Sequence, residues 1–359
     1  MLAGRDARHA LVYGAERSGT AIPWLTGWPV TREAALAFSP GERDVLYVCY
    51  NNHVPNARRL APDADVRPGG SSALAAALDV LATRTGRRGR LAVIGPVPAR
   101  AAARLSSAAS HVEFLDQEYT RLRLVKSAAE LDWLRRGARM TDDAVSALAT
   151  RARPGMTETE LCALLESGYI AAGGWTQIHY LGVTQMAEPG LCVPAQWPSA
   201  RPLAAGDALI CEVSASFGGY PGQLLRTFTV AGPPAPLYRD LHDVAEAAFE
   251  AMTARLKPGA TAADLVAAAS LITGAGYTVY DDLVHGYGGG YLPPVLTRDD
   301  LERQQAAEFT FAAGMTVVIQ PNVITADERA GVQTGELVQV TGTGWESLHR
   351  FPPGLGRIG

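Results

Sequence analysis

The residue best suited to moving protons in this chain is His285, which lies in a glycine run where residues 285–290 read HGYGGG. Imidazole ordinarily titrates near neutrality, and the neighbouring glycines let the backbone present the ring to a ligand. Glu212 is a second ionisable candidate, because a carboxylate within about 4 to 6 Å of the ring favours the imidazolium. Two alternatives stay open: His285 is structural, or Glu212 forms a salt bridge to Arg226.

Polar side chains also interrupt the apolar, β-branched runs that read as strands in the second half of the chain. These are Glu212, Gln223, Gln320 and Gln333. A buried polar side chain costs roughly 1 to 3 kcal/mol unless it is hydrogen-bonded, so several on neighbouring strands predict a shared polar pocket. A solvated face of the sheet is the alternative.

Three of these interruptions are glutamines, which offer hydrogen-bond donors and acceptors without charge. Such groups suit recognition of an amide, urea, imide or heterocycle better than activation of water by a metal. The alternative is that Gln223, Gln320 and Gln333 only fill a site that has lost its chemistry.

The elements that position these residues belong to two predicted domains of a mixed α/β (α+β) protein. The chain has 359 residues, of which 47% are hydrophobic, enough for two cores. Residues 1–122 alternate short apolar runs with alanine-rich helical stretches. Strands are predicted at residues 34–38, 44–50 and 90–95, and a helix at 71–85. Ser127 and Glu130 then form a capping box that opens a helix of the second domain, residues 123–359.

The second domain contains an internal repeat. Residues 154–161 read PGMTETEL and residues 258–265 read PGATAADL, 104 positions apart. In each copy a Pro-Gly turn precedes a threonine that caps a helix. Recurrence by chance is the alternative, but the context of both copies predicts two α/β halves related by a pseudo-two-fold axis.

Composition argues against several classes of partner. The net charge of −4 comes from interspersed acidic and basic residues, which is not typical of nucleic-acid or anionic-membrane binding. No apolar segment is long enough to span a membrane, and the N-terminal sequence MLAGRDARHA carries charges where a signal peptide needs apolar residues. We therefore expect a cytoplasmic protein. The four widely spaced cysteines predict buried thiols, not a metal or redox motif.

The order of four motifs resembles the catalytic domain of the creatinase, prolidase and aminopeptidase P family (M24), whose fold is called pita bread. The motifs are residues 206–212 (GDALICE), 219–227 (GYPGQLLRT), 285–288 (HGYG) and 314–321 (GMTVVIQP). The resemblance covers roughly residues 123–345. More weakly, residues 22–29 (IPWLTGWP) and the elements after them look like the small creatinase-type N-terminal domain.

In the metal-dependent members of this family, two Asp, one His and two Glu hold two divalent ions. The resemblance places Glu212 and Gln223 at the Asp positions, His285 at the His position, and Gln320 and Gly335 at the Glu positions. Two neutral amides and a glycine thus replace three carboxylates, too little negative charge for two divalent cations. The chain is identified as a divergent member that lacks the metal ligands, and we expect no cofactor.

Accessory positions of the family differ as well. Its two further histidines align with Ala195 and Leu292, and the arginine of its last motif with Gln333. Creatinase itself works without metal, but its substrate-holding glutamate aligns with Leu225, so creatine is an unexpected substrate. Glu336 adjoins Gly335, although neighbouring strand residues point to opposite faces.

The resulting site prediction has two parts. His285 is the catalytic acid/base, supported by Glu212. The predicted substrate-binding residues are Gln223, Arg226, Gln320, Gln333, Tyr220, Tyr287, Trp197 and Glu336, and Tyr291 is a further aromatic candidate for the pocket wall.

Three functions fit these observations. The preferred one is a metal-independent, creatinase-like enzyme acting on a small polar, amino-acid-like substrate, at a C–N bond, by hydrolysis or on the same scaffold as a lyase or cyclase. The others are a metal-dependent Xaa-Pro aminopeptidase or prolidase, and a non-catalytic binding module. The family resemblance also implies a homodimer, in which Trp24, Trp28, Asn51, Asn52 and His53 complete the pocket.

Overall fold

The computed structural model describes residues 7–16, 18–85 and 89–359. Part of the N-terminal decapeptide used to predict the cellular location lies outside these residues. The chain divides into two compact units, one ending at Arg123 and the other comprising Leu124–Gly359. The division falls one residue after the predicted position. None of the described helices is long and apolar enough to cross a membrane.

The first unit is built on one mixed sheet with strand order β4-β3-β2-β1-β5-β6. Strand β1 pairs antiparallel with β2 and parallel with β5. The predicted strands are present, and the predicted helix begins two residues late, at Ala73. The strands are β1 (His9–Ala15), β2 (Glu33–Phe38), β3 (Val45–Val48), β4 (Asp65–Pro68), β5 (Arg90–Ile94) and β6 (His111–Phe114).

Helices cover both faces of this sheet. One apolar core contains residues of α1, α2 and α5, and the other contains residues of α3 and α4. Within this unit His53 packs against the rings of Trp28 and Tyr50, and its Nδ1 lies 3.3 Å from the Thr31 hydroxyl. The helices are α1 (Ala21–Thr26), η2 (Asn51–His53), α2 (Val54–Leu60), α3 (Ala73–Thr85), η3 (Ala99–Ala101), α4 (Ala102–Ala108) and α5 (Asp116–Leu122).

The second unit has one long antiparallel sheet with strand order β13-β12-β14-β16-β10-β8-β7. Short strands pair at its margins: β9 with β8, β17 with β16, and β18 in parallel with β10. Its strands are β7 (Trp175–Gln185), β8 (Asp207–Phe217), β9 (Tyr220–Pro221), β10 (Leu224–Val230), β12 (Val284–Tyr287), β13 (Tyr291–Leu296), β14 (Thr316–Ile319), β16 (Gly335–Val340), β17 (Trp345–Ser347) and β18 (Gly356–Ile358); β11 (Thr278–Val279) pairs separately with β15 (Val323–Ile324).

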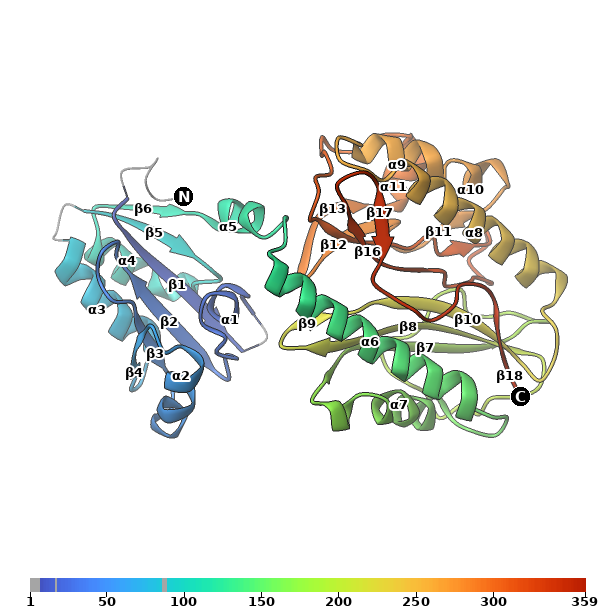
Figure 1. Ribbon diagram of the computed structural model, residues 1–359, viewed down its shortest axis with the longest axis horizontal. Coiled ribbons are helices and arrows are strands. Elements are labelled where there is room, and N and C mark those ends of the chain that lie inside the picture. Colours follow the sequence, from blue (N-terminus) through green and yellow to red (C-terminus); the bar gives the residue numbers. More distant parts are fainter. Residues whose placement is uncertain (1–6, 17, 86–88) are drawn as a thin grey trace. The chain divides into compact units, whose positions relative to one another are not determined.

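Each half of this sheet packs against its own helices (Figure 1). One core joins α6 and α7 to β7, β8 and β10, and another joins α8 and α9 to β12, β14 and β16. The helices of this unit are α6 (Ala128–Arg151), α7 (Glu158–Ser167), η4 (Ile170–Ala172), α8 (Pro236–Arg255), α9 (Ala262–Ala269), α10 (Leu271–Gly274) and α11 (Arg298–Arg303).

Reciprocal capping boxes begin the helices that the sequence placed in the repeat. Thr157 accepts from the Glu160 amide and Thr261 accepts from the Asp264 amide, while each acidic side chain accepts from the backbone of its threonine. The box at Ser127 opens α6 as predicted. The repeated sequence thus starts one helix in each half of the domain, α7 and α9.

Strand register decides which side chains share a face of the long sheet. Glu212 pairs with Leu225, and His285 pairs with Val318. Leu225, Val318 and Leu337 pack together in a small central core that also contains Leu134 and Ala138 of α6. Because side chains alternate along a strand, Glu212 and His285 lie on the face of this central core. We call it the inner face, and the face packed on α8 the outer face.

Candidate functional site

A hydrogen-bonded cluster on the inner face joins Glu212 of β8 to Gln223, directly before β10, and Gln320, directly after β14. The side-chain amide of Gln223 donates to Glu212 Oε1 at 2.7 Å and to Gln320 Oε1 at 3.3 Å. All three side chains are buried. Three of the polar side chains predicted to share a pocket are therefore in contact, and the alternative of a solvated sheet face is wrong for these residues.

The carboxyl group of Glu212 has a strongly altered protonation equilibrium. Burial, together with the smaller effect of the nearby carboxylates of Asp281 and Asp282, raises its pKa to about 8. Removing a carboxylate from water disfavours its charged form, and like charges add to the effect. Glu212 is thus mostly protonated at neutral pH. A protonated carboxyl is a proton donor as well as an acceptor.

His285 is held in the β12–β13 hairpin and is almost completely buried. Its Nδ1 lies 3.3 Å from the Gly286 carbonyl oxygen, its ring stacks on Tyr291 with centroids 4.1 Å apart, and Tyr287 contacts it edge-on. The Tyr291 hydroxyl is in turn bonded to Asp282. Donation from Nδ1 to the carbonyl leaves Nε2 as the basic nitrogen of the ring.

The charge predicted for His285 is corrected by the structure. We expected Glu212 to favour the imidazolium, but burial lowers the pKa of His285 to about 4, and the Gly286 carbonyl and the Gln320 side chain only partly oppose this. Glu212 is itself protonated near pH 7 and supplies no full negative charge. The ring is therefore neutral at neutral pH.

Gln333 lies on the inner face beside β10, where its backbone N–H and C=O both bond to the hydroxyl of Thr227. Its side chain is fully buried, and neither amide atom has a hydrogen-bond partner among the described residues. Gln223 Oε1 is also buried without a partner there. Unpaired buried amide groups cost free energy, so a ligand or water that bonded to them would stabilise the site.

The inner face does not fit a pair of divalent metal ions. Within the described part of the chain, no three His, Cys, Asp or Glu side chains are grouped to hold a metal. The Gln223 amide already donates to Glu212, a contact that a cation bound to this carboxylate would compete with. A Cβ on Gly335, which has φ +149°, would lie 2.3 Å from the Ile319 carbonyl oxygen. No side chain can therefore replace that glycine without movement of the backbone.

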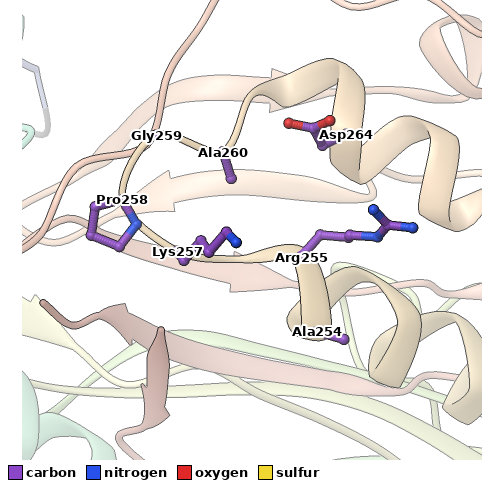
Figure 2. Close-up of a pocket in the computed structure, with 7 residues that line it drawn as sticks. All are labelled: Ala254, Arg255, Lys257, Pro258, Gly259, Ala260 and Asp264. Atoms are coloured by element: carbon purple, nitrogen blue, oxygen red, sulfur yellow. The ribbon is translucent and has the colours of Figure 1, made fainter. Parts of the chain in front are cut away.

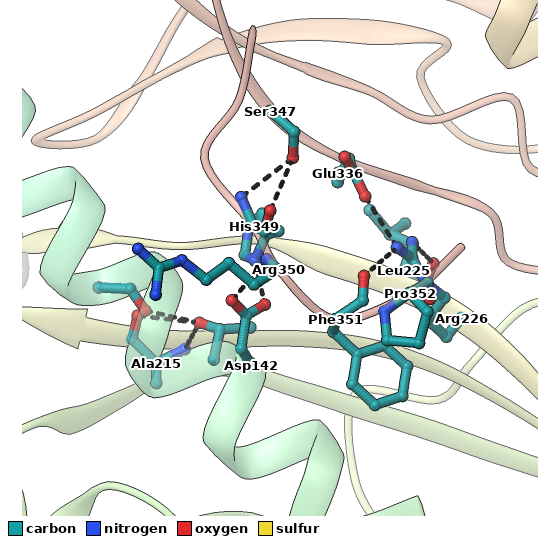
Figure 3. Close-up of polar contacts among 12 residues, drawn as sticks. Asp142, Ala215, Leu225, Arg226, Glu336, Ser347, His349, Arg350, Phe351 and Pro352 are labelled. Carbon is teal, nitrogen blue, oxygen red and sulfur yellow. Dashed lines mark hydrogen bonds and ion pairs between the residues drawn. The ribbon is translucent and has the colours of Figure 1, made fainter.

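Arg226 and Glu336 lie on the outer face and bond to each other at 2.7 Å, both largely buried (Figure 3). The guanidinium also donates to the carbonyl oxygens of Phe351 and Pro352 in the C-terminal segment. These contacts correct two expectations. Arg226 pairs with Glu336 instead of Glu212, and neither residue joins the substrate-binding cluster, because β10 and β16 turn these side chains away from it.

The aromatic residues predicted to line the pocket do not all lie at the inner-face cluster. Tyr287 contacts the His285 ring, as described above. Tyr220 packs in the same central core, but its hydroxyl donates to Glu130 at 3.0 Å. Trp197 is 85% exposed and lies in the connection between β7 and β8, so the expectation that it walls the pocket is not met by contacts within the second unit.

Asp281 and Asp282 were not selected from the sequence, yet they influence both ionisable groups of the site. They raise the pKa of Glu212, and Asp282 holds the tyrosine that stacks on His285. Burial raises the pKa of both aspartates as well. Their one signal in the sequence is an acidic pair directly before the strand that carries His285.

A surface hollow in the second unit is separate from this cluster. It measures about 510 Å³ and lies at the Pro258-Gly259 turn between α8 and α9, with Lys257, Arg255 and Asp264 around it (Figure 2). It shares no residue with the inner-face cluster. Asp264 is already engaged as the helix cap.

Known proteins resemble the chain in sequence and in fold. The model of metallopeptidase family M24 matches residues 132–342. The probable dipeptidase PepE of Mycobacterium tuberculosis is 28% identical over 243 residues, 65% of this chain and 60% of that protein. The Xaa-Pro dipeptidase of Pyrococcus furiosus is 23% identical over 235 residues, 65% of each. The chain thus matches less than two thirds of the length of these relatives.

Solved structures match nearly the whole chain. The prolidase of Pyrococcus horikoshii OT3 aligns with a TM-score of 0.81 and 20% identity, covering 99% of this chain and 97% of that one. The dipeptidase PepE of Mycobacterium ulcerans aligns with a TM-score of 0.81 and 22% identity, covering 99% and 95%. At these identities the likeness establishes the fold, and the predicted two-domain pita-bread architecture is confirmed.

Proposed function

Since the chain belongs to metallopeptidase family M24, we propose that it is a hydrolase of a C–N bond in a small polar, amino-acid-like molecule, and that it works without the metal pair. His285 is the proposed base and Glu212 the proposed acid. The observation that carries this proposal is the burial of Glu212 and His285 on the inner face, which raises the pKa of the carboxyl group and lowers that of the imidazole.

These two groups supply the proton transfers that hydrolysis needs. Nε2 of His285 accepts a proton from the attacking water, and Glu212 donates its proton to the departing nitrogen. This reverses the role first expected for Glu212, which was to hold the imidazole in its charged form. The pair is neutral before reaction, so it favours a neutral group at the reacting centre.

The amides of the cluster support a substrate that presents both donors and acceptors. Gln223 Oε1 and both amide atoms of Gln333 are buried without a partner among the described residues. An amide, urea or imide group satisfies such atoms without introducing charge. We therefore propose a substrate of this class, in place of one anchored by a metal ion.

The test is hydrolysis by full-length protein prepared in chelator. The panel contains dipeptides with and without a C-terminal proline, amino-acid amides, ureido acids and cyclic imides. We expect turnover of an amide, urea or imide that is unchanged by added Mn²⁺ or by EDTA. Turnover that appears only with metal, or that survives His285→Ala, would contradict the proposal.

A metal-dependent dipeptidase or prolidase is the second candidate, and it is supported by the relatives named as dipeptidases. Of the five positions that the family resemblance assigns to metal, Glu212 and His285 carry side chains that ligate divalent ions well. This candidate predicts Mn²⁺ or Co²⁺ in elemental analysis of the dialysed protein, together with metal-activated cleavage of Xaa-Pro dipeptides. Binding of a panel compound without any turnover would instead favour a non-catalytic module.

We also propose that the protein acts in the cytoplasm as a homodimer. The family resemblance supports the dimer, and the exposed ring of Trp197 is a surface that a second copy can cover. Sedimentation equilibrium should give twice the monomer mass. A protein that is monomeric at micromolar concentration would contradict the homodimer, and no partner subunit would then contribute to the proposed site.

A further inference from the structure

A second cavity lies on the outer face, between α8, β16 and the C-terminal segment. Its volume is about 190 Å³. The Arg226–Glu336 pair forms one side of it, and α8 supplies His242, Glu246 and Glu250. It contains none of the inner-face residues described above except Gly335, whose backbone reaches both faces. Nothing in the proposed hydrolysis uses this cavity.

Arg226 has no hydrogen-bond donor left for a ligand in this cavity. A guanidinium has five N–H groups. Nε donates to Pro352 O at 3.1 Å, Nη1 donates to the carbonyl oxygens of Leu225 and Gly335, both at 2.9 Å, and Nη2 donates to Glu336 at 2.7 Å and to Phe351 O at 3.4 Å. All five N–H groups of Arg226 are therefore engaged, and its guanidinium has no free donor for an anionic ligand.

The remaining polar groups of the cavity are mainly acceptors. Three carboxylates, those of Glu246, Glu250 and Glu336, stand against the single charge of Arg226. His242 lies 3.8 Å from Glu246, and burial lowers its pKa, which keeps the ring neutral near pH 7. The cavity thus has an excess of negative charge.

Thr334 supplies an independent sign that the cavity takes a ligand. The residue lines the cavity, and its hydroxyl oxygen is buried and has no hydrogen-bond partner among the residues that the structure describes. The side chain is 6% exposed. Thr334 directly precedes β16 and stands two positions before Glu336, and both residues line the cavity.

The rest of the wall is apolar and aromatic. Phe249 and Trp345 meet edge to face with centroids 6.2 Å apart. Aromatic rings beside carboxylates favour a positively charged group attached to a short apolar body. An apolar cavity of about 150 Å³ is large enough to hold benzene, so this one admits a molecule of similar size.

We propose that this outer-face cavity is a second binding site, and that its ligand is a small organic ammonium compound. The ammonium lies among Glu246, Glu250, Glu336 and the Thr334 hydroxyl, and its apolar body lies against Trp345 and Phe249. A free amino acid is a poor ligand, because its carboxylate meets acidic groups and no cation with a free donor. The site is therefore distinct from one for an amino-acid product of the proposed hydrolysis.

Gly335 provides a reporter for both faces. Its carbonyl accepts from Arg226 on the outer side, while the position of its missing Cβ faces Gln320 in the inner cluster. Ligand in the outer cavity should therefore shift the backbone amide signals of Thr334 and Gly335, in addition to the indole N–H signal of Trp345.

The experiment is an NMR titration of the full chain with n-butylammonium chloride at pH 7.5. Butan-1-ol, sodium butyrate and norvaline serve as neutral, anionic and zwitterionic probes of the same carbon chain length or one carbon longer. Ionic strength is held constant at about 0.15 M, because charge effects depend on salt. We expect saturable shifts at Thr334, Gly335 and Trp345 with n-butylammonium and markedly weaker binding of the other three.

Two variants make the test specific. Replacing both helical carboxylates, Glu246→Gln with Glu250→Gln, should weaken n-butylammonium binding about tenfold. Asp243→Asn removes an exposed charge from the same helix outside the cavity and should leave binding unchanged. Equal binding of butyrate or butanol, no saturable shift with n-butylammonium, or an unweakened double variant would overturn the proposal.

Discussion

Gln223 donates its side-chain N–H to Glu212 at 2.7 Å, so an amide and a protonated carboxyl stand where the family resemblance assigns two metal-binding aspartates. This pair replaces repulsion between two carboxylates with a hydrogen bond. This hydrogen bond stabilises the inner face without a cation. The protonation of Glu212 also makes the free energy of unfolding depend on pH.

The first prediction concerns pH. The pKa of Glu212 rises from 4.5 to about 8 on folding, so the folded state holds a proton that the unfolded state loses in this range. Stability contributed by this proton is full below pH 4.5 and is lost as the pH rises towards 8. His285 has the opposite effect, but only between about pH 4 and 6.5.

Between pH 6.5 and 8 the effect of Glu212 is therefore not opposed by His285. The free energy of unfolding should fall by about 1 to 2 kcal/mol over this interval. Glu212→Gln should abolish most of the fall, because the amide does not titrate. Urea denaturation at a series of pH values measures it, and an equal slope in the variant would show that Glu212 is ionised in the folded protein.

The second prediction is catalytic. His285→Ala should lower turnover of the active panel compound by about 100-fold or more, the usual contribution of a general base. His111→Ala, at an exposed position on β6, is the matched control and should retain full activity. Circular dichroism checks that both variants fold. A His285→Ala protein that is folded and fully active would assign proton transfer to another residue.

The third prediction concerns the backbone at Gly335, where the family resemblance assigns a glutamate ligand. Gly335→Ala should destabilise the protein by about 2 kcal/mol or more, because its Cβ would lie 2.3 Å from Ile319 O and its φ is +149°. Gly342→Ala is the control, since a Cβ there meets nothing within 4 Å. Thermal unfolding gives the midpoint of each variant. Equal midpoints would mean that β14 moves to accommodate the new Cβ at little cost in stability.

The fourth prediction concerns the buried ion pair. A double-mutant cycle with Arg226→Met and Glu336→Gln should give a coupling energy of about 1 to 3 kcal/mol, because both groups are largely removed from water. The exposed pair Arg303 and Asp299, 3.1 Å apart, should give almost none in a parallel cycle. Additive effects at Arg226 and Glu336 would mean that the guanidinium is held by its carbonyl partners alone.

Much of the fold could be predicted from local sequence signals. Capping boxes such as Ser127 with Glu130 act over three residues, and apolar β-branched runs specify strands without reference to the rest of the chain. Three of the four cysteines are buried as expected, and Cys162 is partly exposed.

The site could be predicted only in part, because its geometry depends on strand register. Gln223, Gln320 and Glu212 meet because their strands pair at the positions that bring them to one face. Arg226 stands three residues from Gln223 and faces the other way. Strand alternation already indicated that Glu336 faces away from the Gly335 position, but the pairing of Arg226 with Glu336 depends on β10 and β16 being neighbours in the sheet.

Protonation states were harder still to anticipate. The pKa values of Glu212 and His285 depend on how completely each is buried and on carboxylates that lie far away in sequence, at Asp281 and Asp282 for Glu212. Residue type alone suggested a charged pair. Burial produces a neutral one.

Gly335 also bears on how this protein can change over generations. If an ancestor carried glutamate at this position, the contact between the missing Cβ and Ile319 O means that a single codon change no longer restores it. The neighbouring strand would first have to move, at a cost to stability and without any benefit until the other carboxylates returned. If an ancestor carried that glutamate, its replacement by glycine was therefore easier than its return would be.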